Sequence, residues 1–253
     1  MAAFWVDGSD VADEQLVLRG EEAHHVHKVR RQQVGDTIDA IDGEGHWYRA
    51  RLVEIGRDRV IADIVERGVD TGESAVRFVL APALLKGQRF DFVVEKATEL
   101  GVAAIWPTLS ERGVARAGSD AKVERWQRLA RAAVKQCGRS RLPELAPPHA
   151  FSAVVERLVE CCDAVFMGAL SERDALCGDV VGEGAVSSAG LLVGPEGGFS
   201  PGEIALAQDL GVRVFCWGER VLRADTASIV LSGLLLSACA RSNHTSGKAI
   251  YGD

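Results

Sequence analysis

The sequence predicts two parts: a small β-barrel or sandwich, then a larger α/β domain with a mainly parallel sheet. Three observations support this. Short β-rich runs follow one another closely up to about Val69, and from about Val76 onward apolar runs alternate with amphipathic stretches. Between them, residues 67–74 (RGVDTGES) have the composition of a linker. We therefore expect a first domain over residues 1–72 and a second over residues 73–253.

The composition is that of a globular protein. The chain has 253 residues, of which 47% are hydrophobic and 26% charged, and this length allows one large domain or two modest ones. The first residues show no basic region followed by an apolar run, so no secretory signal is indicated. The six cysteines form no C-x-x-C pair, which favours reduced, packed thiols over a metal site. We expect a cytoplasmic protein that needs no metal.

In the first part, three β-rich runs predict strands over residues 37–41, 47–53 and 59–65. The first two are separated by the turn sequence Asp42-Gly43-Glu44-Gly45. Strands this short and this closely spaced are typical of a small barrel or sandwich.

In the second part, the apolar run 76–81 predicts a buried strand, and residues 90–100 predict an amphipathic helix that Gly101 ends. A strand over 102–107 and a long helix over 120–137 follow. Residues 164–168, 190–194 and 212–218 are three further strand-like runs.

Two more helices are expected near the C-terminus. Ser200-Pro201-Gly202-Glu203 has the form of a capping box with proline at the first helical position. Residues 225–240 predict the last helix. Its apolar stretch is too short and too often interrupted to span a bilayer, so we expect a buried helix and no membrane association.

Charge is distributed unevenly. The net charge of −7 argues against a protein that coats nucleic acid indiscriminately. Residues 112 to 141, however, include nine basic residues and only two acidic ones, Asp120 and Glu124. This segment therefore has a local excess of seven positive charges. A solvated helix face and a surface for an anionic partner both explain this run.

Two loops hold the most informative residues. Residues 191–201 (LLVGPEGGFSP) run from a predicted strand through a glycine-rich loop into the capped helix. Residues 215–227 (FCWGERVLRADTA) leave the next predicted strand in the same manner. Ligands of open α/β sheets bind beyond the carboxyl ends of strands, so the two loops could converge on one ligand. Neither has the spacing of a dinucleotide fingerprint or a phosphate loop. Each loop also has an explanation that involves no ligand. The first could be only a tight strand-to-helix turn, and the second could be only a surface ion pair beside an ordinary helix cap.

These motifs resemble a known family. Residues 194–200 (GPEGGFS) and 218–227 (GERVLRADTA) are similar to the RsmE family, the 16S ribosomal RNA uracil-N3 methyltransferases of the SPOUT (trefoil-knot) superfamily. Residues 86–102 resemble the first helix of its catalytic domain, and residues 110–112 and 136–139 resemble its basic surface. Residues 25–36 resemble its small RNA-binding barrel of the PUA type. The chain departs from the family's Leu-Arg-Thr-Glu-Thr, having Ala224 and Asp225 in place of threonine and glutamate.

The resemblance implies a PUA-like β-barrel followed by a SPOUT α/β-knot domain that binds S-adenosylmethionine (SAM) and forms a homodimer. A trefoil knot is rare in proteins, so it is expected from the resemblance alone. The implied donor-binding residues are Leu192, Gly194, Pro195, Glu196, Gly197, Gly198, Trp217, Gly218, Val221, Leu222, Arg223 and Thr226.

Methyl transfer to a uracil N3 suggests roles for four charged residues of the loops. The nitrogen must lose its proton as it attacks, so a cation near the uracil carbonyl oxygens would stabilise the developing charge. Arg223 and Arg220 are the candidates. A carboxylate could accept the proton, and Glu196 and Asp225 are the acidic candidates.

The implied partner is 16S rRNA in the small ribosomal subunit. Residues expected to contact RNA are His25, Arg31, Lys86, Arg112, Gln136, Arg139 and Arg141. Two other readings stay open: a knotted methyltransferase acting on a ribose 2′-hydroxyl, and a non-catalytic RNA-binding factor for ribosome assembly. A nucleotide-dependent oxidoreductase is disfavoured because the dinucleotide fingerprint is missing.

Overall fold

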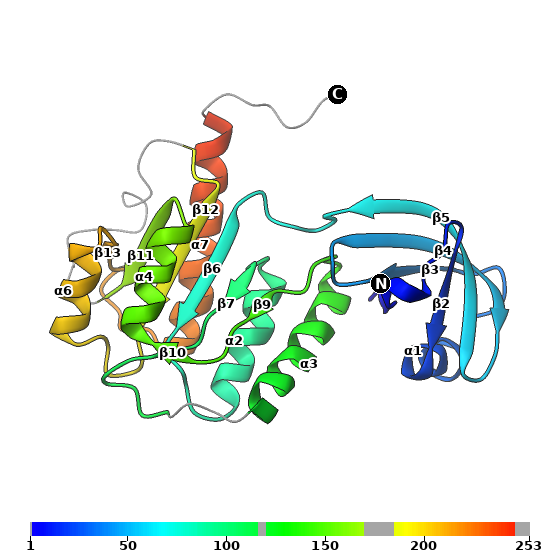
Figure 1. Ribbon diagram of the computed structural model, residues 1–253, viewed down its shortest axis with the longest axis horizontal. Coiled ribbons are helices and arrows are strands. Elements are labelled where there is room, and N and C mark those ends of the chain that lie inside the picture. The colour runs from blue at the N-terminus through cyan, green and yellow to red at the C-terminus, as the bar shows by residue number, and fades with distance from the viewer. Residues whose placement is uncertain (1, 116–119, 170–184, 246–253) are drawn as a thin grey trace. The chain divides into compact units, whose positions relative to one another are not determined.

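The computed structural model describes residues 2–115, 120–169 and 185–245, and its contacts divide the chain into two compact units (Figure 1). Unit 1 comprises Met1–Glu73 and Ala130–Leu142, and unit 2 comprises Ser74–Leu129 and Pro143–Asp253. The ranges expected from the sequence differ from these units at the single residue Glu73, which lies in unit 1, and in one longer segment. Ala130–Leu142, which we assigned to the second domain, packs within unit 1, where Val134 is buried with Ala3 and Ile41.

Unit 1 is built on a five-stranded sheet in the order β1-β3-β4-β5-β2. The strands are β1 (Phe4–Trp5), β2 (Gln15–Arg19), β3 (Thr37–Ile41), β4 (His46–Ile55) and β5 (Arg59–Val69). All neighbours are antiparallel except β1 and β3. The three predicted strands are confirmed, whereas β1 and β2 were not anticipated. The turn between β3 and β4 is held by the buried Asp42 carboxylate, which accepts from the backbone N–H groups of Glu44 and His46.

The helical segments of unit 1 are short. A 3₁₀ turn covers Gly8–Asp10 and α1 covers Gly20–His24, and α1 continues directly into a π-helical turn over His25–Val29. Ala23 and Val26 on these turns enter a core with side chains from the sheet. The other buried members of that core are Phe4, Val6, Leu16, Leu18, Ile38, Ala40, Tyr48, Ala50, Leu52, Val60 and Ala62.

Unit 2 is built on a six-stranded sheet in the order β13-β11-β12-β6-β7-β9, and all of its pairings are parallel. The strands are β6 (Arg77–Pro82), β7 (Ala104–Ile105), β9 (Glu144–Leu145), β11 (Ala164–Gly168), β12 (Ser188–Val193) and β13 (Arg213–Phe215). Two short strands, β8 (Thr108–Leu109) and β10 (His149–Ala150), pair separately. The parallel sheet expected from the alternating pattern is therefore confirmed.

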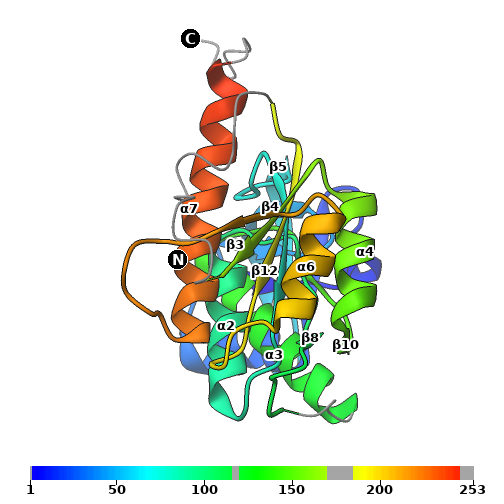
Figure 2. The same cartoon turned by 90° about the vertical axis from the view of Figure 1, so that its left-hand side faces the viewer.

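Helices cover both faces of this sheet. Figure 2 shows α2 (Gln88–Glu99) and α7 (Ala224–Thr245) on one side, and α4 (Phe151–Cys161) and α6 (Pro201–Asp209) on the other. Helix α3 (Asp120–Cys137) has the predicted bounds, and Gly138 after it has a φ of +83°. That left-handed conformation suits glycine at a helix end. Helix α4 was not anticipated, although its apolar face is buried through Phe151, Val154, Val155 and Leu158.

Helix α7 packs in unit 2 against α2, β6 and β12. Among the described residues, Ala224–Arg241 is the one helical stretch long and apolar enough to cross a membrane by length and composition, and 39% of that stretch is buried. The hydroxyls of Ser228 and Ser232 each donate to a carbonyl one turn earlier, at 2.8 and 2.6 Å. These bonds satisfy the buried hydroxyls within the helix, as a core helix requires.

Candidate functional site

A cavity of about 350 Å³ lies in unit 2 at the carboxyl ends of β11, β12 and β13. The loop after β12 and the loop after β13 both line it, so the two loops converge on one cavity. Figure 2 shows the second loop leaving β13 and entering α7. The cavity wall is completed by Gly168 at the end of β11 and Ala169 after it, by Ile204 of α6, and by Ala224, Ala227 and Leu231 of α7.

The first loop, residues 194–200, turns tightly. The N–H of Gly198 donates to the Pro195 carbonyl at 2.8 Å, and Gly198 has a φ of +67°. A Cβ on Gly194 would lie 3.2 Å from the ring of the buried Phe199, so a side chain at 194 would crowd that ring. The segment is thus both a tight strand-to-helix turn and a wall of the cavity.

The predicted capping box at the start of α6 is confirmed. The Ser200 hydroxyl accepts from the Glu203 N–H at 3.2 Å, and the Glu203 carboxylate accepts from the Ser200 N–H at 2.8 Å. Together these bonds fix the point where the first loop enters the helix.

Two arginines from other segments contact the first loop. Arg89, in the first turn of α2, pairs with the Glu196 carboxylate, and both side chains are about half exposed. Arg112 donates from Nη1 to the Gly197 carbonyl at 3.2 Å and also lines the cavity. Arg89 was not a predicted site residue, although it belongs to the 86–91 motif. Nothing in the sequence indicated that this arginine would reach residue 196.

The second loop has a different character. Cys216 at its start is buried, whereas Trp217 and Val221 are exposed by 39% and 72% although both line the cavity. Gly218 has a φ of +69°, which suits glycine. Arg220 and Leu222 also line the cavity.

Eight of the twelve predicted donor-binding residues line the cavity, and four do not. Those that line it are Gly194, Pro195, Glu196, Gly197, Gly198, Trp217, Val221 and Leu222. Leu192 instead lies in the sheet core. Gly218, Arg223 and Thr226 lie beside the wall without forming it.

Of the four predicted catalytic residues, Arg220 and Glu196 line the cavity and Arg223 and Asp225 do not. The Asp225 carboxylate accepts from the Thr226 N–H at 2.8 Å, which is a local bond at the start of α7. Ala224 lines the cavity and is buried, so one of the two departures from the family motif falls on the cavity wall itself.

The sequence did not predict the wall residues that come from strand ends, from α6 and the residue before its cap, and from α7. The missed residues are Gly168, Ala169, Val193, Phe199, Ile204, Phe215, Cys216, Ala224, Ala227 and Leu231, and Arg112 was assigned to RNA alone. The apolar run 164–168 is a signal for Gly168, because it ends at the same sheet edge as the two loops.

The predicted RNA-contact residues occupy different settings. In unit 2, Lys86 and Arg112 are exposed. In unit 1, Arg31 is exposed with a φ of +52°, Gln136 is exposed, and the half-buried His25 packs edge-on against Phe4.

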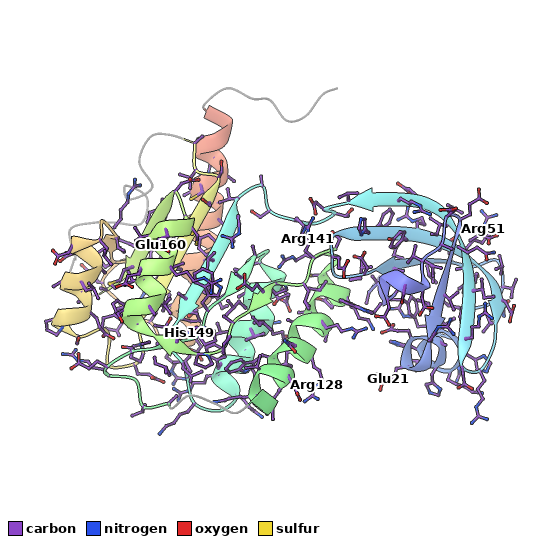
Figure 3. All side chains as sticks on the ribbon, viewed as in Figure 1. Glu21, Arg51, Arg128, Arg141, His149 and Glu160 are labelled. Atoms are coloured by element: carbon purple, nitrogen blue, oxygen red, sulfur yellow. The ribbon has the colours of Figure 1, made fainter. Side chains whose placement is uncertain are left out.

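Two arginines that follow α3 form ion pairs with carboxylates of unit 1. Arg141, labelled in Figure 3, is half exposed and pairs with Asp70, and this carboxylate raises the pKa of the guanidinium. Arg139 is only 3% exposed and donates to Glu73, with Nη2 at 2.7 Å from Oε2. Because its guanidinium is buried against a carboxylate, Arg139 is not presented to a phosphate in this arrangement.

Within the ranges that the structure describes, no group of three or more His, Cys, Asp or Glu side chains could hold a metal ion.

Comparisons with known proteins agree with this architecture. Residues 72–236 match the model of an RNA methyltransferase domain, and residues 18–65 match the model of an RNA methyltransferase PUA domain. The fold is therefore that of an RNA methyltransferase that carries a PUA domain. The chain belongs to the ribosomal RNA small subunit methyltransferase E family, as its motifs indicated.

Relatives with that name occur in several bacteria. The Synechocystis sp. protein is 33% identical over 87% of this chain and 74% of its own length. The Mycobacterium tuberculosis protein is 31% identical over 91% of this chain and 89% of its own length.

Two solved structures are also similar. The family member from Neisseria gonorrhoeae, bound to SAM, is 27% identical with a TM-score of 0.82, covering 94% of this chain and 97% of that one. A methyltransferase from Legionella pneumophila in complex with SAM is 28% identical with a TM-score of 0.80, covering 94% and 98%.

Proposed function

We propose that this protein transfers the methyl group of SAM to N3 of a uridine in 16S rRNA. The observation that carries the proposal is the cavity of about 350 Å³ that is lined by both loops that follow β12 and β13. Its size is within the range of small-molecule sites. Family members of known structure include one that is bound to SAM.

The composition of the wall suits this donor. Gly194, Gly197 and Gly198 carry no side chain, so a ligand can approach the backbone of the cavity wall closely at these positions. Ile204, Leu222 and Leu231 offer apolar contacts for the flat adenine ring. Few charges line the cavity, so binding depends on shape and backbone hydrogen bonds more than on ion pairing.

The methyl group is already activated by its sulfonium leaving group, so the protein must position the uracil and remove the N3 proton. Arg220 lines the cavity and would stabilise negative charge developing on the uracil carbonyl oxygens. Glu196 would accept the N3 proton as the new N–CH₃ bond forms and S-adenosylhomocysteine leaves. Arg223 and Asp225 have less support, because neither lines the cavity.

A base-modifying enzyme needs its target base unpaired, so it must recognise the shape of the RNA around that base. RNA recognition would use basic and polar side chains of both units. We propose contacts from Arg31, Arg141, Gln136 and His25 of unit 1 and from Lys86 and Arg112 of unit 2. Arg139 is better explained by its ion pair with Glu73. The protein would act in the cytoplasm as a homodimer without a metal.

The test is to incubate the full chain with SAM and small ribosomal subunits that lack the modification, then digest the RNA and identify the methylated nucleoside by mass spectrometry. We expect 3-methyluridine. A 2′-O-methylated nucleoside would instead support the ribose methyltransferase. Donor binding without any product would support a non-catalytic assembly factor.

A further inference from the structure

The carboxylate of Glu203 joins two segments far apart in the chain. Besides its capping bond to Ser200, it accepts from the Ser110 hydroxyl at 3.1 Å and from the Glu111 N–H at 2.9 Å. Glu203 is only 8% exposed and Ser110 only 9%. Hydrogen bonds to a buried charged group are stronger than neutral ones and costly to leave unmade. One buried carboxylate therefore fixes the start of α6 and residues 110–111 to each other.

The segment fixed in this way carries Arg112. The N–H of Gly113 donates to the Ser110 carbonyl at 2.9 Å, which closes a turn with Arg112 inside it. The stem of Arg112 lies against Gly197, because a Cβ on that glycine would be 3.5 Å from the arginine Cβ. Its guanidinium then reaches the Gly197 carbonyl at the cavity.

Arg112 keeps most of its hydrogen-bonding capacity. The bond to Gly197 uses one of the five N–H donors of a guanidinium. In the part of the chain that the structure describes, Arg112 forms no other hydrogen bond or ion pair. The remaining donors are available to an acceptor at the cavity.

We propose that Glu203 is a positioning residue for RNA binding, acting through Arg112. Arg112 contacts an acceptor group of the RNA next to the target base, and Glu203 holds the 110–113 turn so that this guanidinium lies at the cavity. The inference rests on the proposed function. It assigns Glu203 a task beyond capping α6, which would require only the bonds to Ser200.

The test is a double-mutant cycle on the full chain, measured as the dissociation constant of unmodified 16S rRNA in the presence of SAM. Arg112→Ala and Glu203→Ala should each weaken RNA binding about tenfold, the scale of one charged hydrogen bond. In the Arg112→Ala background, Glu203→Ala should add less than about twofold, because the two changes remove the same contact. The dissociation constant of SAM should change less than that of RNA.

Two further variants separate positioning from folding. Ser110→Ala removes one bond of the 110–111 segment and leaves the capping box intact, so it should weaken RNA binding in the same direction by a smaller factor. Ser200→Ala removes the other half of the capping box and leaves the bonds to residues 110 and 111, so it should leave RNA binding unchanged.

The outcomes are distinct from those of the proposed function. The inference would be overturned if Glu203→Ala weakened RNA binding equally in the unaltered protein and in the Arg112→Ala variant. It would also be overturned if Ser200→Ala weakened RNA binding as much as Glu203→Ala does. Binding of RNA and SAM by the unaltered protein without methylated product would overturn the proposed function alone, since the cycle is read from binding.

Discussion

The two loops that line the cavity differ in how firmly the protein holds them. The first, residues 194–200, is fixed by a backbone turn, a capping box, the pair of Glu196 with Arg89, and the bond from Arg112. In the second, no described side chain from Trp217 to Leu222 forms a hydrogen bond or ion pair within the described parts of the chain. Trp217 and Val221 also leave apolar surface exposed beside the cavity.

This difference suggests that the two loops have different roles in ligand binding. A loop already held in its bound geometry loses little conformational entropy when a ligand binds, so the first loop is suited to set affinity for the donor. Within the described parts of the chain, the second loop has no side-chain hydrogen bonds or ion pairs to lose, so it can change conformation more readily than the first. We therefore expect it to become ordered against the donor and to carry the groups that respond to substrate. The following predictions test this comparison, from the largest expected effect to the smallest.

The largest effect should come from crowding the fixed loop. Gly194→Val would push a branched side chain into the Phe199 ring, already 3.2 Å from an added Cβ. Overpacking of a close-packed wall costs about 1–3 kcal/mol, so SAM should bind up to about 100-fold more weakly in calorimetry. Gly202→Ala is the matched control, because its Cβ would meet nothing closer than 3.8 Å. Equal binding by both variants would show that the first loop does not set donor affinity.

The second prediction concerns the arginines of the less constrained loop. Arg220→Ala should lower kcat about 100-fold, the scale of one preorganised electrostatic contact in a transition state, with little change in SAM binding. Arg223→Ala should lower kcat much less, because Arg223 does not line the cavity. Single-turnover methyl transfer measures both. The reverse ranking would place Arg223 at the reacting base and would show that the second loop rearranges on substrate binding.

The third prediction uses the alkylation rate of Cys216 to report on the conformation of the second loop. Cys216 is buried and lines the cavity. SAM at ten times its dissociation constant should slow alkylation of Cys216 about tenfold, if alkylation requires an open, donor-free loop. Cys162 is the internal reference, since burial first, and then the neighbouring Cys161, raises its pKa to about 12. At pH 8 it remains a thiol and reacts slowly with or without SAM. Peptide mass spectrometry reports both sites. Equal slowing of Cys162 would indicate a global effect of SAM on the protein.

The smallest effect should come from the ion pair on the first loop. Arg89 and Glu196 are about half exposed, and pairs of this kind contribute about 0–1 kcal/mol. Arg89→Ala should therefore weaken SAM binding by less than about fivefold, and added salt should reduce the difference from the unaltered protein. A much larger and salt-independent loss would mean that Arg89 contacts the donor itself.

Much of the architecture could be predicted because it depends on local patterns. The bounds of α3, the capping box at Ser200 and the parallel strands follow from hydrophobic periodicity and from residues that end or start helices. The strands β7 and β9 have two residues each, too few to show a period, and β9 was missed for that reason. Within the site, the loop glycines were predicted, but the contacts from Arg89 and Arg112 were not.

By itself the sequence determined that two glycine-containing loops follow two successive predicted strands, that a helix capped by Ser200 begins there, and that the chain has the motifs of its family. Only the tertiary structure decided that Glu203 also bonds residues 110 and 111, and that Arg139 is buried against Glu73 instead of facing a phosphate. The physical reason is the distance along the chain over which each kind of interaction acts. Capping and periodicity act over three or four residues, whereas the partners of Glu203 and Arg139 lie 93, 92 and 66 residues away. A charged side chain has many possible partners at such separations, and the packing of the whole fold selects one.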